Sequence, residues 1–158
     1  MGLIKQIDDN LGRLFKFLEE AGHMDDTMIV FTSDHGDYQG DHWLGEKELF
    51  HEQSVRVPMI IYDPSDYANK TRGTKEERFI EAIDLLPTFL DAVESPASKH
   101  RLEGNSLIPL LKGEETKNWK KFVFSEIDYA FNEAREILNI GASDARAFMA
   151  VSYTHLRA

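Results

Sequence analysis

The sequence predicts an α/β protein with a mostly parallel sheet flanked by helices. Three features carry this prediction: an amphipathic helical pattern over about residues 2–21, an apolar strand pattern over about 27–33, and a second strand pattern over 57–62. A helix that leads into a fully apolar strand through a short loop is half of a parallel α/β unit. The first strand runs directly into Asp34 and His35, and open α/β sheets bind their ligands at that end of a strand.

Composition and charge limit the classes of partner. The chain has 158 residues, of which 42% are hydrophobic and 29% charged, as in an ordinary globular protein with a real core. Its net charge of −10 argues against nucleic acid and against an anionic membrane surface as partners. A small anionic substrate remains possible, because a metal ion and one lysine can reverse the field locally. No apolar run is long enough to span a bilayer. The absence of cysteine excludes disulfides and thiolate metal sites, and it leaves the compartment undecided.

The first helix is predicted from apolar residues three and four positions apart. These residues are Leu3, Ile4, Ile7, Leu11, Leu14, Phe15 and Leu18. Gly22 suits the position just after the helix, and Asp25 and Asp26 give a turn before the strand. We expect this helix to pack on a sheet face rather than to lie on a membrane, because its polar face carries both signs of charge.

The remaining elements follow from shorter patterns. Residues 34–54 lack a steady period and are interpreted as a functional loop. Asp84 is available as the N-cap of a helix over 84–93. The other predicted elements are a polar loop at 69–78, a short strand at 79–83, a loop at 95–104, a helical turn at 106–111, a strand at 122–126, a helix at 130–139 and the start of a strand at 147–151.

Asp34 and His35 are candidate metal ligands, and Lys47 could reach an anion bound to that metal. Adjacent residues on an extended strand point to opposite faces, so both can bind one ion only if the backbone turns, which Gly36 permits. A carboxylate with a neutral imidazole suits Mg, Mn, Zn or Fe and tolerates Ca. A lone Asp-His-Gly is more often a turn with a capped polar pair than a metal site, so the surrounding motifs decide.

Those motifs resemble the sulfatase family of the alkaline phosphatase superfamily, which includes arylsulfatases, choline and iduronate sulfatases, and phosphonate monoester hydrolases. The resemblance covers residues 1 to about 112. Its segments are Phe31-Thr32-Ser33-Asp34-His35-Gly36, Gln39-Gly40-Asp41-His42, Lys47, Arg56-Val57-Pro58-Met59-Ile60, Ile83-Asp84-Leu85-Leu86-Pro87-Thr88 and Gly104-Asn105-Ser106-Leu107-Ile108-Pro109-Leu110-Leu111.

This resemblance implies a partial alkaline-phosphatase-like sandwich and a role for each matching residue. Asp34 and His35 match the second pair of ligands to one divalent metal ion, for which Ca or Mn is expected. Lys47 matches the lysine that contacts sulfate or phosphoryl oxygens. His42 could orient the anion or protonate a leaving group, or it could pack beside Trp43. Arg56 is expected to pair with a carboxylate of the scaffold rather than with substrate.

The family's nucleophile lies in a Cys/Ser-x-Pro-x-Arg motif, where the first residue becomes formylglycine. That motif and the first metal-binding aspartates have no counterpart in this sequence. Residues 1–151 are therefore predicted to be the C-terminal portion of a sulfatase-like catalytic domain that is truncated at both ends and inactive alone. Residues 152–158 resemble adaptor sequence rather than a native tail.

Three functions compete at this point. The first is a fragment of a hydrolase that cleaves sulfate esters. The second is the same scaffold acting on phosphonate or phosphate esters. The third is a non-catalytic module that binds a metal or an anion. The specific substrate and the oligomeric state stay open.

Overall fold

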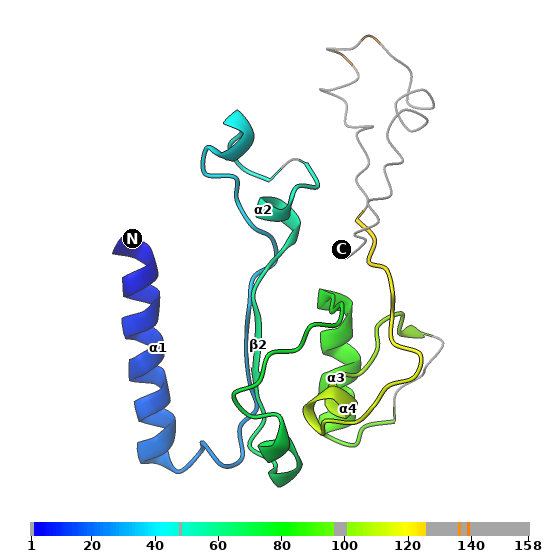
Figure 1. Ribbon diagram of the computed structural model, residues 1–158. Coiled ribbons are helices and arrows are strands. Elements are labelled where there is room, and N and C mark those ends of the chain that lie inside the picture. Colours follow the sequence, from blue (N-terminus) through cyan, green and yellow to red (C-terminus); the bar gives the residue numbers. More distant parts are fainter. Residues whose placement is uncertain (1, 48, 97–100, 126–135, 137–138, 140–158) are drawn as a thin grey trace.

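The computed structural model describes residues 2–47, 49–96, 101–125, 136 and 139 (Figure 1). In chain order, its elements are α1 (Gly2–Ala21), β1 (Ile29–Thr32), the 3-10 helix η1 (Asp41–Trp43), α2 (Glu52–Val55), β2 (Met59–Tyr62), the 3-10 helices η2 (Asp66–Lys70) and η3 (Ala82–Asp84), α3 (Leu85–Ala92) and α4 (Ile108–Leu111).

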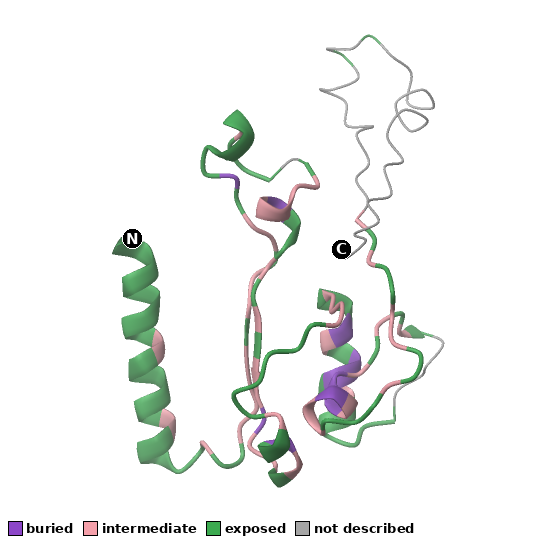
Figure 2. Ribbon diagram, in the orientation of Figure 1, coloured by how far each residue is buried: buried purple, intermediate pink, exposed green. Residues whose placement is uncertain are grey.

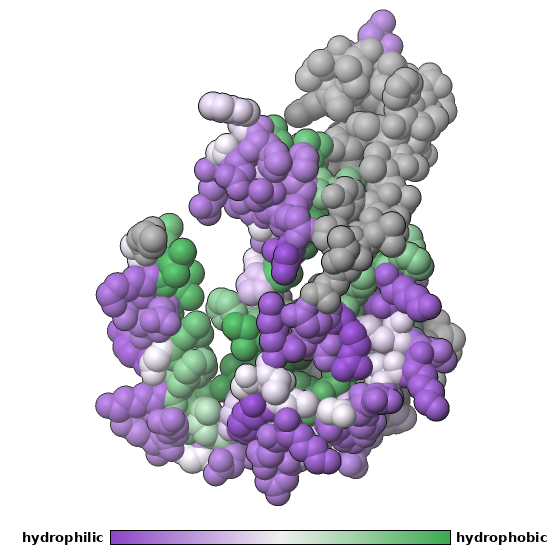
Figure 3. Space-filling view, in the orientation of Figure 1, coloured by the Kyte–Doolittle hydropathy of each residue, from purple (hydrophilic) through white to green (hydrophobic). Residues whose placement is uncertain are grey.

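Helix α1 forms where the periodicity predicts it and ends at the predicted glycine. Gly22 has φ 74°, and the amide of His23 donates to the carbonyl of Leu18 at 2.8 Å, which closes the helix in a Schellman-type end. No residue of α1 is buried, and Figure 2 shows the helix almost entirely exposed. The predicted packing of its apolar face on a sheet is therefore absent from the described part of the chain, and Figure 3 shows that face as hydrophobic surface along α1.

Strands β1 and β2 pair with each other, and they run antiparallel. Ile29 lies opposite Tyr62, and Thr32 lies opposite Met59. The parallel arrangement predicted for the sheet is thus wrong for this pair. A parallel neighbour needs a crossover, usually through a long helix, whereas the only α-helix described between β1 and β2 is the four-residue α2. The intervening segment folds back on itself, so the chain returns alongside β1 in the opposite direction.

A small core forms where α3 meets α4. Leu107, Ile108 and Leu110 are buried there, and the Thr88 hydroxyl links the two segments. That hydroxyl donates to the Asp84 carbonyl at 2.6 Å and accepts from the Leu107 amide at 2.8 Å. The predicted helices over 84–93 and 106–111 are confirmed as α3 and α4.

Asp84 does not cap α3 as predicted. Its carboxylate is fully buried and accepts the amides of Glu81 and Asn105, both at 2.8 Å, and the ammonium of Lys120 at 2.8 and 2.9 Å. The bond from the Glu81 amide bends the chain into η3, so the strand predicted at 79–83 does not form. A local bond to the Glu81 amide has replaced the strand, and the long-range partners Asn105 and Lys120 engage the carboxylate that was expected to cap the helix.

The rest of the predicted elements divide into two groups. Residues 122–125 are described and contain no strand, contrary to the prediction for 122–126. The strand predicted at 147–151 lies outside the described residues, as does the helix predicted at 130–139 apart from residues 136 and 139. Within the described part of the chain, no helix is both long and apolar enough to cross a membrane.

Candidate active site at the end of strand β1

The carboxylate of Asp34 is held beside its own neighbour. Its Oδ1 atom accepts the backbone amide of His35 at 3.0 Å and the Ser33 hydroxyl at 3.3 Å. These bonds, the His35 amide foremost, lower the pKa of Asp34 below its usual value. The side chain is 83% exposed, so the charged carboxylate is open to a ligand.

The imidazole of His35 is oriented by the next residue. Its Nδ1 atom lies 2.7 Å from the carbonyl oxygen of Gly36. A carbonyl only accepts, so Nδ1 carries the hydrogen and Nε2 keeps a free lone pair. Nε2 lies 3.4 Å from Oδ2 of Asp34. The two side chains therefore point to the same side, as the metal-ligand prediction requires. They can do so because both residues lie beyond the end of β1, where the backbone is no longer an extended strand.

Gly36 has a role different from the predicted turn. Its φ is not in the left-handed region. Its amide donates to the carbonyl of Ser54 at 2.7 Å, and a Cβ atom at this position would collide with the carbonyl oxygen of Gln53. Glycine is required here because two backbone segments approach closely, which is a further constraint on this position.

The side chain of Lys47, later in the loop that follows β1, reaches the imidazole of His35. Its Nζ atom lies 2.5 Å from Nε2 of His35 and donates to the free lone pair. Its own carbonyl accepts the Ser54 hydroxyl at 2.8 Å. The carboxylate of Asp34, the imidazole of His35 and the ammonium of Lys47 thus converge, which sequence spacing alone does not reveal.

His42 makes its described ring contacts elsewhere. Its ring stacks on that of His51 with centroids 4.3 Å apart, and it meets the buried ring of Tyr38 edge-on at 6.2 Å. Its assignment as a catalytic group stays a prediction. Arg56 bonds to the carboxylate of Glu52 at 3.3 Å, which confirms the predicted scaffold pairing.

The donor set at Asp34 and His35 fits a divalent cation. It offers one hard carboxylate oxygen and one unprotonated imidazole nitrogen, and the two atoms are close enough to share an ion. No group of three or more acidic or histidine side chains suited to a metal occurs among the residues the structure describes, so this pair supplies two ligands only. The Lys47 ammonium uses the same lone pair, so it would have to leave Nε2 for that nitrogen to hold a cation.

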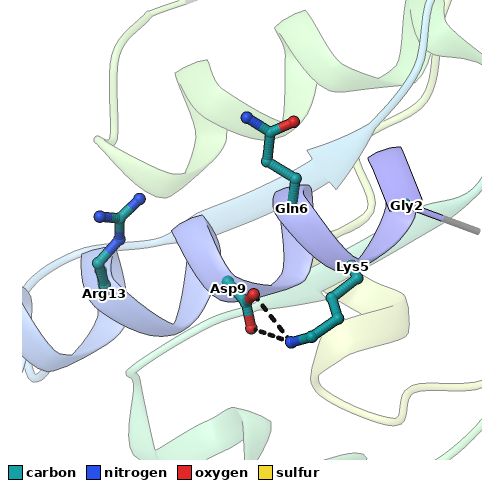
Figure 4. Close-up of a pocket in the computed structure, with 5 residues that line it drawn as sticks. All are labelled: Gly2, Lys5, Gln6, Asp9 and Arg13. Carbon is teal, nitrogen blue, oxygen red and sulfur yellow. Dashed lines mark hydrogen bonds and ion pairs between the residues drawn. The ribbon is translucent and has the colours of Figure 1, made fainter.

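A pocket of about 630 Å³ lies elsewhere, along α1 (Figure 4). It is lined by Gly2, Lys5, Gln6, Asp9 and Arg13, all on one helix. Lys5 and Asp9 already satisfy each other in an ion pair at 2.8 Å. A hollow along a single exposed helix offers no convergent groups, so the candidate site remains the end of β1.

Comparisons with known proteins agree with the motifs. A sequence model of the Sulfatase family matches residues 1–95. The multifunctional alkaline phosphatase superfamily protein PehA of Trinickia caryophylli is 42% identical over 130 residues, which are 81% of this chain and 24% of that protein. An arylsulfatase of Clostridium perfringens is 36% identical over 134 residues, 84% of this chain and 27% of that protein.

A solved structure shows the same fold. The phosphonate monoester hydrolase of Agrobacterium radiobacter superimposes with a TM-score of 0.78 at 35% identity, over 89% of this chain and 28% of that one. This likeness confirms the alkaline-phosphatase-like α/β class. The chain spans about a quarter of the length of these two relatives. With the family match over 1–95, these residues belong to the sulfatase family of hydrolases.

Proposed function

We propose that this chain supplies a pair of metal ligands and an anion-binding lysine to a hydrolase that cleaves sulfate esters. The observation that carries the proposal is the meeting of Asp34 Oδ2, His35 Nε2 and Lys47 Nζ at the end of β1. Membership of the sulfatase family and likeness to a named arylsulfatase support this choice of reaction.

Each residue has a distinct task in this proposal. Asp34 and His35 would hold one divalent ion, Ca or Mn. When bound, such an ion withdraws charge from an oxygen of the ester. Lys47 turns its ammonium toward the non-bridging oxygens of the anionic group and neutralises charge that grows there in the transition state. His42 orients the anion or donates a proton to the leaving oxygen.

Turnover needs a nucleophile that these residues do not contain. No Cys/Ser-x-Pro-x-Arg motif occurs in the sequence. We therefore propose that residues 1–151 act as one portion of a catalytic domain and have no turnover alone. Residues 152–158 are proposed to be a non-native tail without a role.

A second candidate is cleavage of phosphonate or phosphate esters. The phosphonate monoester hydrolase of Agrobacterium radiobacter, with its TM-score of 0.78, favours it. Sulfate and phosphonate groups both present anionic oxygens on a tetrahedral centre, and Lys47 would bind either. The pocket for the organic part of the ester decides between them, and the three converging residues do not form that pocket.

The test uses the longest natural protein that contains residues 1–151. We expect it to hydrolyse 4-nitrophenyl sulfate with a higher kcat/KM than the matched phenylphosphonate monoester, and to lose activity on chelation. A preference for the phosphonate above about tenfold, or about 1.4 kcal/mol in transition-state binding, would replace the first candidate by the second. If neither ester is hydrolysed with Ca or Mn present, the chain would be a non-catalytic binding module.

A further inference from the structure

Ser54 joins the two segments that carry the proposed metal ligand and the lysine. It lies in α2 and is 5% exposed. Its hydroxyl donates to the carbonyl of Lys47 at 2.8 Å, and its carbonyl accepts the amide of Gly36 at 2.7 Å. Gly36 follows His35 directly. One buried residue thus bonds both to Lys47 and to the backbone beside His35.

Ser54 is itself anchored through a buried aromatic residue. Its amide donates to the carbonyl of His51 at 2.9 Å. The hydroxyl of Tyr38, a residue only 1% exposed, accepts the His51 amide at 3.3 Å and lies 2.8 Å from His51 Nδ1. The amide of Tyr38 also donates to the carbonyl of Glu46 at 2.9 Å. The backbone around Lys47 is therefore held from two sides.

We propose that Ser54 is the positioning residue for Lys47, an inference that rests on the proposed function of the site. A lysine side chain is long and flexible, so its ammonium can be placed accurately only when its backbone is fixed. The Ser54 hydroxyl fixes that backbone relative to Gly36, and hence relative to His35. The backbone at Gly36 approaches the backbone of Gln53 so closely that no Cβ atom fits between them, which keeps these two segments at a short separation.

A double-mutant cycle in the longest natural protein that contains residues 1–151 tests the proposal. Ser54→Ala removes the hydroxyl and keeps the carbonyl that binds Gly36. We expect it to lower kcat/KM by about tenfold, because a small displacement of a charged catalytic group is costly. In a Lys47→Ala background the same change should cost less than about twofold, because there is no ammonium left to position. Ser54→Thr keeps the hydroxyl and should restore most of the activity.

The matched control is Thr71→Val, which removes a hydroxyl that donates to the Leu111 carbonyl at 2.6 Å, far along the chain from Lys47. We expect it to leave kcat/KM within about twofold, although it loses a hydrogen bond of the same kind. If Ser54→Ala costs the same in both backgrounds, its effect does not pass through Lys47 and the proposal is overturned.

A second variant covers the case in which Ser54→Ala does not fold. Tyr38→Phe keeps the buried ring and removes the hydroxyl that anchors His51, so it should reduce kcat/KM in the native background and have no effect with Lys47→Ala. An equal loss in both backgrounds would again contradict the positioning role. Unchanged activity of Lys47→Ala alone would instead refute the proposed function of Lys47, which separates the two failures.

Discussion

A single nitrogen lone pair organises the candidate site. Nε2 of His35 is free because Nδ1 donates to the Gly36 carbonyl, and both Asp34 Oδ2 and Lys47 Nζ lie within 3.4 Å of it. The backbone amide of His35 lowers the pKa of Asp34 below its usual value of 3.8. The carboxylate therefore stays charged to a lower pH than an ordinary aspartate does. Loss of this ligand by protonation is therefore confined to strongly acidic solution.

Replacing the lysine should slow catalysis without unfolding the protein. We expect Lys47→Ala to lower kcat by about 10²-fold, the scale for loss of one preorganised charge contact in a transition state. Lys75→Ala is the matched control, since Lys75 is an exposed lysine whose ion pair with Glu77 spans 3.5 Å. Steady-state kinetics on an aryl ester give the result, and native kinetics for Lys47→Ala would remove this residue from the site.

Replacing the carboxylate should remove the metal. In the longest natural protein that contains residues 1–151, we expect Asp34→Ala to abolish metal-dependent hydrolysis, because a hard divalent ion then loses a carboxylate ligand. Metal content after gel filtration, measured by mass spectrometry, gives a readout independent of activity. Asp26→Ala, at another exposed aspartate, should retain the ion. Full metal occupancy in Asp34→Ala would show that Asp34 is not a ligand.

At the scale of elements, a charged pair fixes the segment before η3. The Glu76 carboxylate accepts two side-chain nitrogens of Arg78, both at 2.7 Å, and the amides of Glu77 and Arg78. Arg78 lowers the pKa of Glu76 below its usual value of 4.5. As the pH falls, Glu76 is therefore protonated in the unfolded chain before it is protonated in the folded protein. The ion pair stabilises the fold fully above pH 4.5, and this stabilisation is lost as the pH falls through the lowered pKa of Glu76.

Glu76→Gln should accordingly show a pH-dependent loss of stability. We expect the free energy of unfolding to fall by about 0.5–1 kcal/mol at neutral pH, the range of well-formed pairs that are partly exposed. The difference from the native protein should vanish in acid, below the pKa of Glu76. Urea unfolding at several pH values measures it, with the exposed Glu114→Gln as control. A deficit that persists unchanged in acid would mean that the charge of Glu76 is not its cause.

The cluster of the buried Asp84 with the partly exposed Glu81 and Lys120 ties the segment that contains Lys120 to η3 and α3. Lys120→Ala leaves the fully buried Asp84 carboxylate without its ammonium partner. We expect the free energy of unfolding to fall by about 3 kcal/mol, as when one partner of a buried pair is removed. Lys117→Ala, at an exposed position, should change it by less than about 0.5 kcal/mol. Equal effects of the two changes would contradict the structural role of Lys120.

At the scale of the molecule, much apolar surface is exposed in the described part of the chain. Leu3 and Ile4 are 76% and 71% exposed, and Val93 is 72% exposed. Apolar surface of this extent favours association. We expect the 158-residue chain, produced alone, to self-associate in sedimentation velocity as its concentration rises.

A paired substitution tests the cause of that association. Leu3→Gln with Ile4→Gln should shift the distribution toward monomer, because both changes remove apolar surface from α1. Lys16→Gln with Glu19→Gln, on the polar face, should leave it unchanged. A monomer with one cooperative thermal transition for the unmodified chain would contradict the expectation.

Local pattern determined a large part of this molecule. The spacing of apolar residues predicts α1, and apolar runs predict β1 and β2. Apolar side chains that recur with the period of a helix line one face of it, and a short run of apolar, β-favouring residues is typical of a strand. The same holds for α3 and α4. The motif around Asp34, His35 and Lys47 indicated the family, which the comparisons confirm.

Tertiary structure alone decided how these pieces meet. The antiparallel pairing of β1 with β2, the close approach at Gly36 and the bonds from Ser54 to Lys47 and Gly36 join residues that are not neighbours in the chain. Asp84 became a buried ion-pair partner rather than a helix cap because Lys120, 36 positions away, came to meet it. Periodicity reports which side of an element is apolar. Periodicity carries no information on which distant group will lie against an element. The contact between the Lys47 ammonium and Nε2 of His35 is therefore visible only in the tertiary structure.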